Sequence, residues 1–111
     1  MQDTNANHFD LETLRSNLEY DDSFVSEFLT LLKNEFEVCL VILREELQKE
    51  NIKKINATAH RIKGTALNGC CKELVVLAAT LENTLVFDKA IISDLVEQIT
   101  SEMAFIKTLI P

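Results

Sequence analysis

The chain has 111 residues, enough for one domain with a packed core and too few for two. Two glycines and a single proline leave too few turn residues for an all-β sandwich or barrel. Apolar residues make up 47%, which is too many for a disordered chain. The net charge of −7 disfavours nucleic acid and anionic membranes as partners.

The sequence carries no signal for export or membrane insertion. No apolar run approaches the roughly 18 residues of a membrane span, and Met1–Asn5 lacks the charged and apolar regions of a signal peptide. The three cysteines, an odd number, are expected to be free thiols. We therefore expect one cytoplasmic domain over residues 1–111, with about residues 1–8 flexible.

Taken in chain order, apolar residues recur at spacings of three and four, which predicts amphipathic helices. A short helix is expected after Asp10, a long one after Asp21, a third after Asn51, then a fourth, and a last one after Asp88. Short connections favour antiparallel neighbours. The predicted fold class is all-α, an antiparallel up-down four-helix bundle with a short additional N-terminal helix.

The same pattern gives expectations for faces and ends of helices. The long second helix is expected to bury Phe24 and Leu31, and the fourth to continue in register to Leu85. Asn68–Gly69 is expected to end the third helix and to supply its left-handed cap residue.

Basic residues are concentrated in one segment. Between Asn51 and Lys72 there are five bases and no acid, whereas the rest of the chain holds all 18 acids. This asymmetry predicts a face that docks an acidic partner or an anionic group. A solvated helix face is the plainer explanation.

Gly64 lies inside the third predicted helix, where glycine costs about 1 kcal/mol relative to alanine. His60, Lys63 and Gly64 stand at i, i+3 and i+4, so they share one helical face. That face is about 100° from the predicted buried stripe, which leaves the imidazole exposed. A cation beside it and a missing side chain below it suit a histidine that carries an anion. The alternative is an ordinary surface histidine and a close helix contact at Gly64.

The segment Ala59–Ala66 (AHRIKGTA), with Leu74, Leu77 and Leu81–Glu82, resembles the signature of histidine-containing phosphotransfer (HPt) domains. That signature is His-x-x-Lys-Gly, then small residues, then spaced leucines ending in Leu-Glu or Leu-Gln. The sequence departs from it at Cys70, where the family usually has glycine.

The resemblance implies that His60 accepts a phosphoryl group from an aspartyl phosphate on a receiver domain and passes it to another receiver's aspartate. The protein would be a carrier and not an enzyme. Glu82 would hold Nδ1 of the imidazole, so that the group goes to Nε2. Lys63 would stabilise the phosphoryl oxygens, and Gly64 would leave room for the approaching partner.

The expected partners are receiver domains, including those of a hybrid sensor histidine kinase. Arg61 and Leu67 are the predicted docking residues. Nothing in the sequence resembles an ATP site or a Mg²⁺ cage, so we expect no cofactor here and the metal on the receiver.

Three alternatives remain open at this point. The domain could be phosphorylated directly by the ATP-binding domain of a histidine kinase, as at the N-terminus of chemotaxis kinases. It could be a bundle that only binds partners, an activity that replacement of His60 would leave intact. A metal site of His60, Cys70 and Cys71 is disfavoured, because adjacent cysteines cannot easily both point at one ion.

Overall fold

The computed structural model describes residues 4–111 and is all-helical over that range. A short 3₁₀ helix, η1 (Thr4–Asn7), and helix α1 (Leu11–Asn17) precede four longer helices, which are α2 (Asp22–Gln48), α3 (Ile52–Asn68), α4 (Lys72–Glu82) and α5 (Lys89–Leu109). The predicted all-α class is confirmed. None of the helices in this described part is long and apolar enough to cross a lipid bilayer.

Four helices begin at side chains that the sequence marks as caps. Asp10, Asp21, Asn51 and Asp88 each accept a hydrogen bond from the backbone N–H three residues further on, at 3.1–3.3 Å. Each bond satisfies an N–H group that has no partner inside its own helix. The four predicted starts are confirmed.

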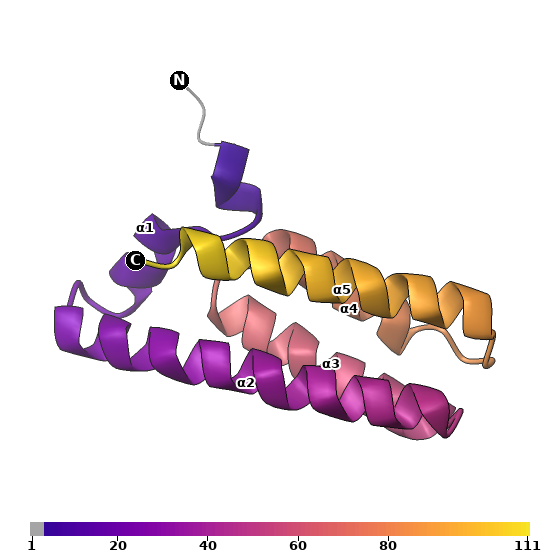
Figure 1. Ribbon diagram of the computed structural model, residues 1–111. Coiled ribbons are helices and arrows are strands. Elements are labelled where there is room, and N and C mark those ends of the chain that lie inside the picture. Colours follow the sequence, from indigo (N-terminus) through magenta and orange to yellow (C-terminus); the bar gives the residue numbers. More distant parts are fainter. Residues whose placement is uncertain (1–3) are drawn as a thin grey trace.

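The four longer helices pack in chain order around one core (Figure 1). α2 contacts α3, α3 contacts α4, α4 contacts α5, and α5 returns to α2, so α3 and α5 are diagonal neighbours. Burial of each large apolar side chain contributes about 1.5–3 kcal/mol. Those buried most completely include Phe36, Leu43, Ile55, Ile62, Leu74, Leu81, Ile92, Ile99, Met103 and Ile106.

α2 buries most of its predicted stripe, including Leu32, Phe36 and Leu43, but two predicted positions are exposed. Phe24 and Leu31 are 61% and 60% exposed, whereas Val25 and Leu29 are buried. Near the start of α2, Val25 and Leu29 have the same three-four spacing as the predicted positions, so spacing alone could not choose between them. The expectation for Phe24 and Leu31 was wrong, and α2 carries a second, exposed apolar stripe.

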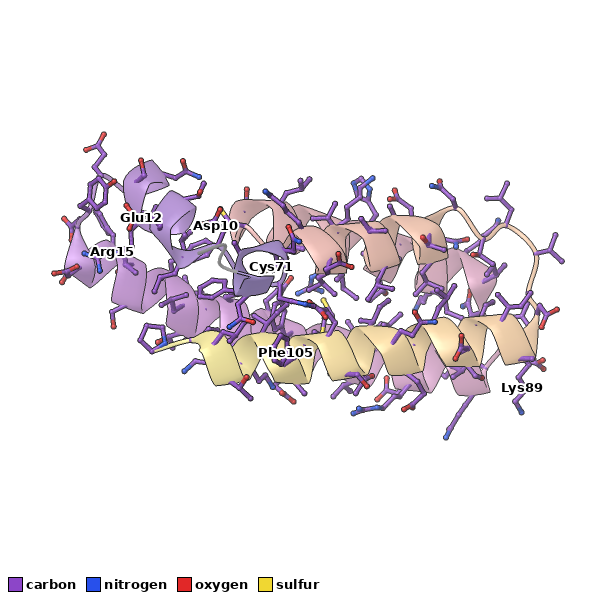
Figure 2. The ribbon with its side chains drawn as sticks, turned by 90° about the horizontal axis from the view of Figure 1, so that it is seen from above. Asp10, Glu12, Arg15, Cys71, Lys89 and Phe105 are labelled. Atoms are coloured by element: carbon purple, nitrogen blue, oxygen red, sulfur yellow. The ribbon has the colours of Figure 1, made fainter. Side chains whose placement is uncertain are left out.

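α1 lies at the end of the bundle where α3 connects to α4 (Figure 1). Leu14 on α1 is buried, and the Asp10 N–H donates to the Cys70 carbonyl at 3.0 Å. Figure 2 places Asp10 and Cys71 toward this end, with Lys89 at the other.

The segment before α1 is in contact with α5. The sequence analysis assigned His8 to a flexible N-terminus, but its Nδ1 lies 2.7 Å from Oε2 of Glu102. Its ring also meets the Phe105 ring edge to face, with centroids 4.8 Å apart. Residues 1–3 of the predicted flexible segment lie outside the described residues.

α3 ends at Asn68, as predicted, but the left-handed residue beyond it is Cys70, with φ of 60°. The Cys71 N–H donates to the Ala66 carbonyl at 2.9 Å, and the Cys70 N–H to the Leu67 carbonyl at 3.2 Å. This pair of bonds is the Schellman motif. Because glycine adopts positive φ without steric cost, the motif accounts for the glycine that the HPt signature usually has at this place.

Gly69 therefore does not supply the left-handed cap, and that part of the prediction was wrong. Its φ is −86°, which any residue can adopt. A Cβ atom at this position would lie 3.0 Å from Cδ1 of the buried Leu32. Gly69 thus allows the end of α3 to approach α2 closely.

α4 was expected to continue to Leu85 but ends at Glu82, so that expectation was wrong. Leu85 lies in the connection to α5 and is exposed.

Cys39, Cys70 and Cys71 are free thiols, as predicted.

Candidate functional site

His60 lies near the middle of α3 on its outward face. Ala59 and Ile62 beside it are buried against the core, whereas 70% of the His60 side chain is exposed. Within residues 4–111, its Nε2 atom has no hydrogen-bond partner. The imidazole is therefore open to solvent on the side of Nε2, as the spacing predicted.

Glu82, on the last turn of α4, holds the other side of the ring. Its Oε1 lies 2.6 Å from Nδ1 of His60, and its Oε2 lies 2.7 Å from Nζ of Lys63. The hydrogen bond from Lys63, and then that from His60, hold the pKa of Glu82 below its ordinary value. An ionised carboxylate can only accept, so Nδ1 donates and the neutral imidazole presents its lone pair at Nε2.

Gly64 leaves open space one turn after His60. A Cβ atom added there would meet nothing within 4 Å. Gly64 is therefore not a close helix contact, and the face of α3 next to the imidazole is unobstructed.

Acidic side chains of neighbouring helices pair with several of the basic side chains between Asn51 and Lys72. Nε and Nη2 of Arg61 donate to the two carboxylate oxygens of Glu35 at 2.6 and 2.7 Å, and Arg61 lowers the pKa of Glu35. Nζ of Lys54 lies 3.9 Å from Glu46, and Lys63 is held by the carboxylate described above. The basic excess in the sequence is therefore much smaller in space.

Apolar surface lies beyond His60 along α3 and in a groove toward α2. Leu67, on the His60 face, is 59% exposed. Toward α2, the exposed apolar stripe borders a groove lined by Phe28, Leu31, Leu32, Glu35, Thr65 and Asn68. This groove was not predicted from the sequence, because Leu31 was expected in the core. The second apolar stripe of α2 was the signal that could have revealed it.

The alternative metal site has no support in the geometry. His60 and Cys70 are ten residues apart, which is about 15 Å along a helix. Burial raises the pKa of Cys71 to about 12, so its thiol is not a ready ligand. In the part of the chain that is described, no group of three histidine, cysteine or acidic side chains could hold a metal ion.

A comparison with protein families places the chain. Its sequence matches the family model described as Hpt domain over residues 27–108. The chain belongs to the Hpt domain family. Searches of curated proteins and of solved structures gave no match. Hpt domains are phosphoryl carriers that interact with receiver domains and kinases in phosphorelays. His60 is the only histidine within the matched residues of this Hpt domain, because His8 precedes them.

Proposed function

We propose that this Hpt domain, an antiparallel up-down four-helix bundle, is a cytoplasmic phosphoryl carrier. His60 takes the group from the aspartyl phosphate of one receiver domain and passes it to the aspartate of another. The observation that supports this most directly is the bond from Nδ1 of His60 to Glu82, which leaves Nε2 free and facing outward.

The chemistry follows from that arrangement. The Nε2 lone pair attacks the phosphorus, an N–P bond forms, and the bond from phosphorus to the aspartate oxygen breaks with its electrons on the carboxylate. Nδ1 keeps its proton, so the ring becomes cationic, and the Glu82 carboxylate 2.6 Å away offsets that charge. Lys63 compensates charge on the phosphoryl oxygens. Transfer to the next aspartate reverses these steps, with Mg²⁺ supplied by the receiver.

The receiver docks on the face that contains His60. Leu67 and the groove between α2 and α3 offer apolar contact toward the C-terminal end of α3, beyond the imidazole. Arg61, already paired with Glu35, lies between this groove and the ring and contributes a polar contact. A surface of this kind fits a modest, transient interface, as a carrier that must release its partner requires.

The donor is tested by offering the domain two sources of phosphoryl groups. One reaction contains a phosphorylated receiver, and the other an ATP-loaded histidine kinase without its receiver. We expect label on the domain only in the first. Label in the second alone would support direct phosphorylation by the kinase, and label in neither would support a bundle that only binds partners.

A further inference from the structure

Asn56 connects α3 to the last turn of α4. Its side-chain Nδ2 donates to the carbonyls of Leu81 and Thr84, both at 2.9 Å. These two carbonyls stand on either side of Glu82 in the chain. The partly buried amide therefore holds, through two hydrogen bonds, the backbone segment from which the Glu82 side chain extends.

The last carbonyls of a helix have no partner within the helix and need one from outside. At the end of α4 the Leu81 carbonyl accepts from the Thr84 N–H at 3.2 Å and from Asn56, and the Thr84 carbonyl accepts from Asn56. A side chain of another helix thus fixes where this turn lies against α3. Asn56 is also four residues before His60, and residues at that spacing share a face. One face of α3 thus carries both the phosphoacceptor and the residue that anchors its carboxylate partner.

We propose that Asn56 is a positioning residue for phosphoryl transfer, which holds the end of α4 so that Glu82 meets Nδ1 of His60. The proposal rests on the proposed function and adds a residue to it. Without the amide, the Leu81 carbonyl keeps only its bond from the Thr84 N–H, the Thr84 carbonyl turns to water, and the last turn of α4 moves away from α3. Glu82 then keeps its ion pair with Lys63, whose long side chain can follow the carboxylate, and loses its hydrogen bond with Nδ1 of the imidazole.

Loss of the contact with Glu82 changes which nitrogen of the His60 imidazole carries the proton. When Nδ1 has no fixed acceptor, the neutral imidazole divides between its two tautomers, and in one of them Nε2 carries the proton and cannot attack. Partners that orient metal-binding histidines typically change affinity or activity by about 10–100-fold when they are removed, and we take the same range for His60. We expect the loss of the Asn56 amide to fall at the lower end of that range.

The test combines a tautomer measurement with a transfer rate. Asn56→Leu keeps the size of the side chain and removes its N–H groups; Asn56→Asp, a second variant in case the first does not fold, keeps the shape but cannot donate. Nitrogen-15 shifts of the His60 ring, recorded where the imidazole is neutral, should show one tautomer in the wild type and a mixture in the variants. Single-turnover transfer from a phosphorylated receiver should slow by about tenfold.

The same substitution in a Glu82→Ala background separates positioning from general damage. If Asn56 acts through Glu82, it should change the rate there by less than about twofold, because coupled residues are not additive. Asn51→Ala is the matched control: it removes a capping asparagine of the same helix, at the start of α3, and should leave the tautomer and the rate unchanged.

Two results would overturn the proposal: a folded Asn56 variant with the wild-type tautomer and rate, or the same loss of rate with and without Glu82. Failure of the wild-type domain to accept a phosphoryl group is a different outcome. It would overturn the proposed function, while the tautomer measurement would still report on Asn56.

Discussion

Nδ1 of His60 lies 2.6 Å from the carboxylate of Glu82, which is 22 residues further along the chain and on the next helix. The other oxygen of this carboxylate holds Lys63 at 2.7 Å. One acidic side chain therefore orients the ring and holds the nearest cation. A phosphoryl group on Nε2 would be a stronger anion beside Lys63 and would compete with Glu82 for it.

The titration of Glu82 should reflect these two donors. Because Lys63 and His60 hydrogen-bond to the carboxylate, the pKa of Glu82 lies below its ordinary value of 4.5 in the folded domain. A depressed carboxyl pKa contributes stability that is present above the unfolded value and lost as the pH falls through the folded one. We expect the Glu82 carboxyl carbon to titrate below pH 4.5 by NMR.

Substitutions should show which of the two donors lowers the pKa of Glu82 more. Lys63→Ala should raise the pKa of Glu82 more than His60→Gln does, because the bond from Lys63 is the greater cause of the shift. A wild-type midpoint at or above 4.5 would show that the two contacts do not persist in solution.

Gly64 should be replaceable without damage to the fold. Its Cβ would meet nothing within 4 Å, so Gly64→Ala should stabilise the domain by about 0.5–1 kcal/mol. Gly64→Gln should keep the fold but place a long side chain beside the imidazole and slow transfer from the receiver. Thermal unfolding and transfer rates of both variants check this. Strong destabilisation by alanine would mean that Gly64 is a packing contact after all.

Substitutions at two adjacent positions in the connection between α3 and α4 should change the stability of the domain in opposite directions. Cys70 has positive φ, so Cys70→Gly should raise stability by up to about 1 kcal/mol, the steric gain being reduced by the flexibility of glycine. Gly69→Ala should lower it by about 1 kcal/mol, because the new Cβ crowds Leu32. Denaturant unfolding measures both, and a loss of stability in Cys70→Gly would contradict the assignment of the cap to Cys70.

Receiver binding should depend on apolar residues beside His60. Leu67→Ser and Leu31→Ser should each weaken binding by about 1 kcal/mol or more, because serine buries less apolar area against the receiver than leucine does. Ile91→Ser is the matched control, since Ile91 is also exposed but lies on α5, diagonally across the bundle from α3. Binding can be measured by calorimetry with an unphosphorylated receiver. Equal effects at the three positions would mean that the receiver does not use this face.

Local signals made much of this domain predictable. A capping side chain acts within three residues of itself, so the starts of four helices could be located from the sequence, as at Asp10 and Asp88. The i, i+3 and i+4 spacing likewise placed Lys63 and Gly64 on one face with His60 before any fold was known.

The features that the sequence did not reveal depend on other helices. Which apolar positions near the start of α2 are buried is decided by packing against other helices, and so the burial expected for Leu31 was wrong. The basic excess of α3 is reduced by Glu35, an acid of α2. The hydrogen bonds from Asn56 to the end of α4 span 25 and 28 positions of the sequence, and no local pattern indicates them.

The most direct test of the central claim, that His60 carries the phosphoryl group, is labelling by a phosphorylated receiver. The wild-type domain and the control variant His8→Gln should acquire label that is labile in acid and stable in base, as expected for a phosphohistidine. His60→Gln should acquire none while keeping its helical circular dichroism. Label of the same kind on the His60→Gln variant would contradict the account.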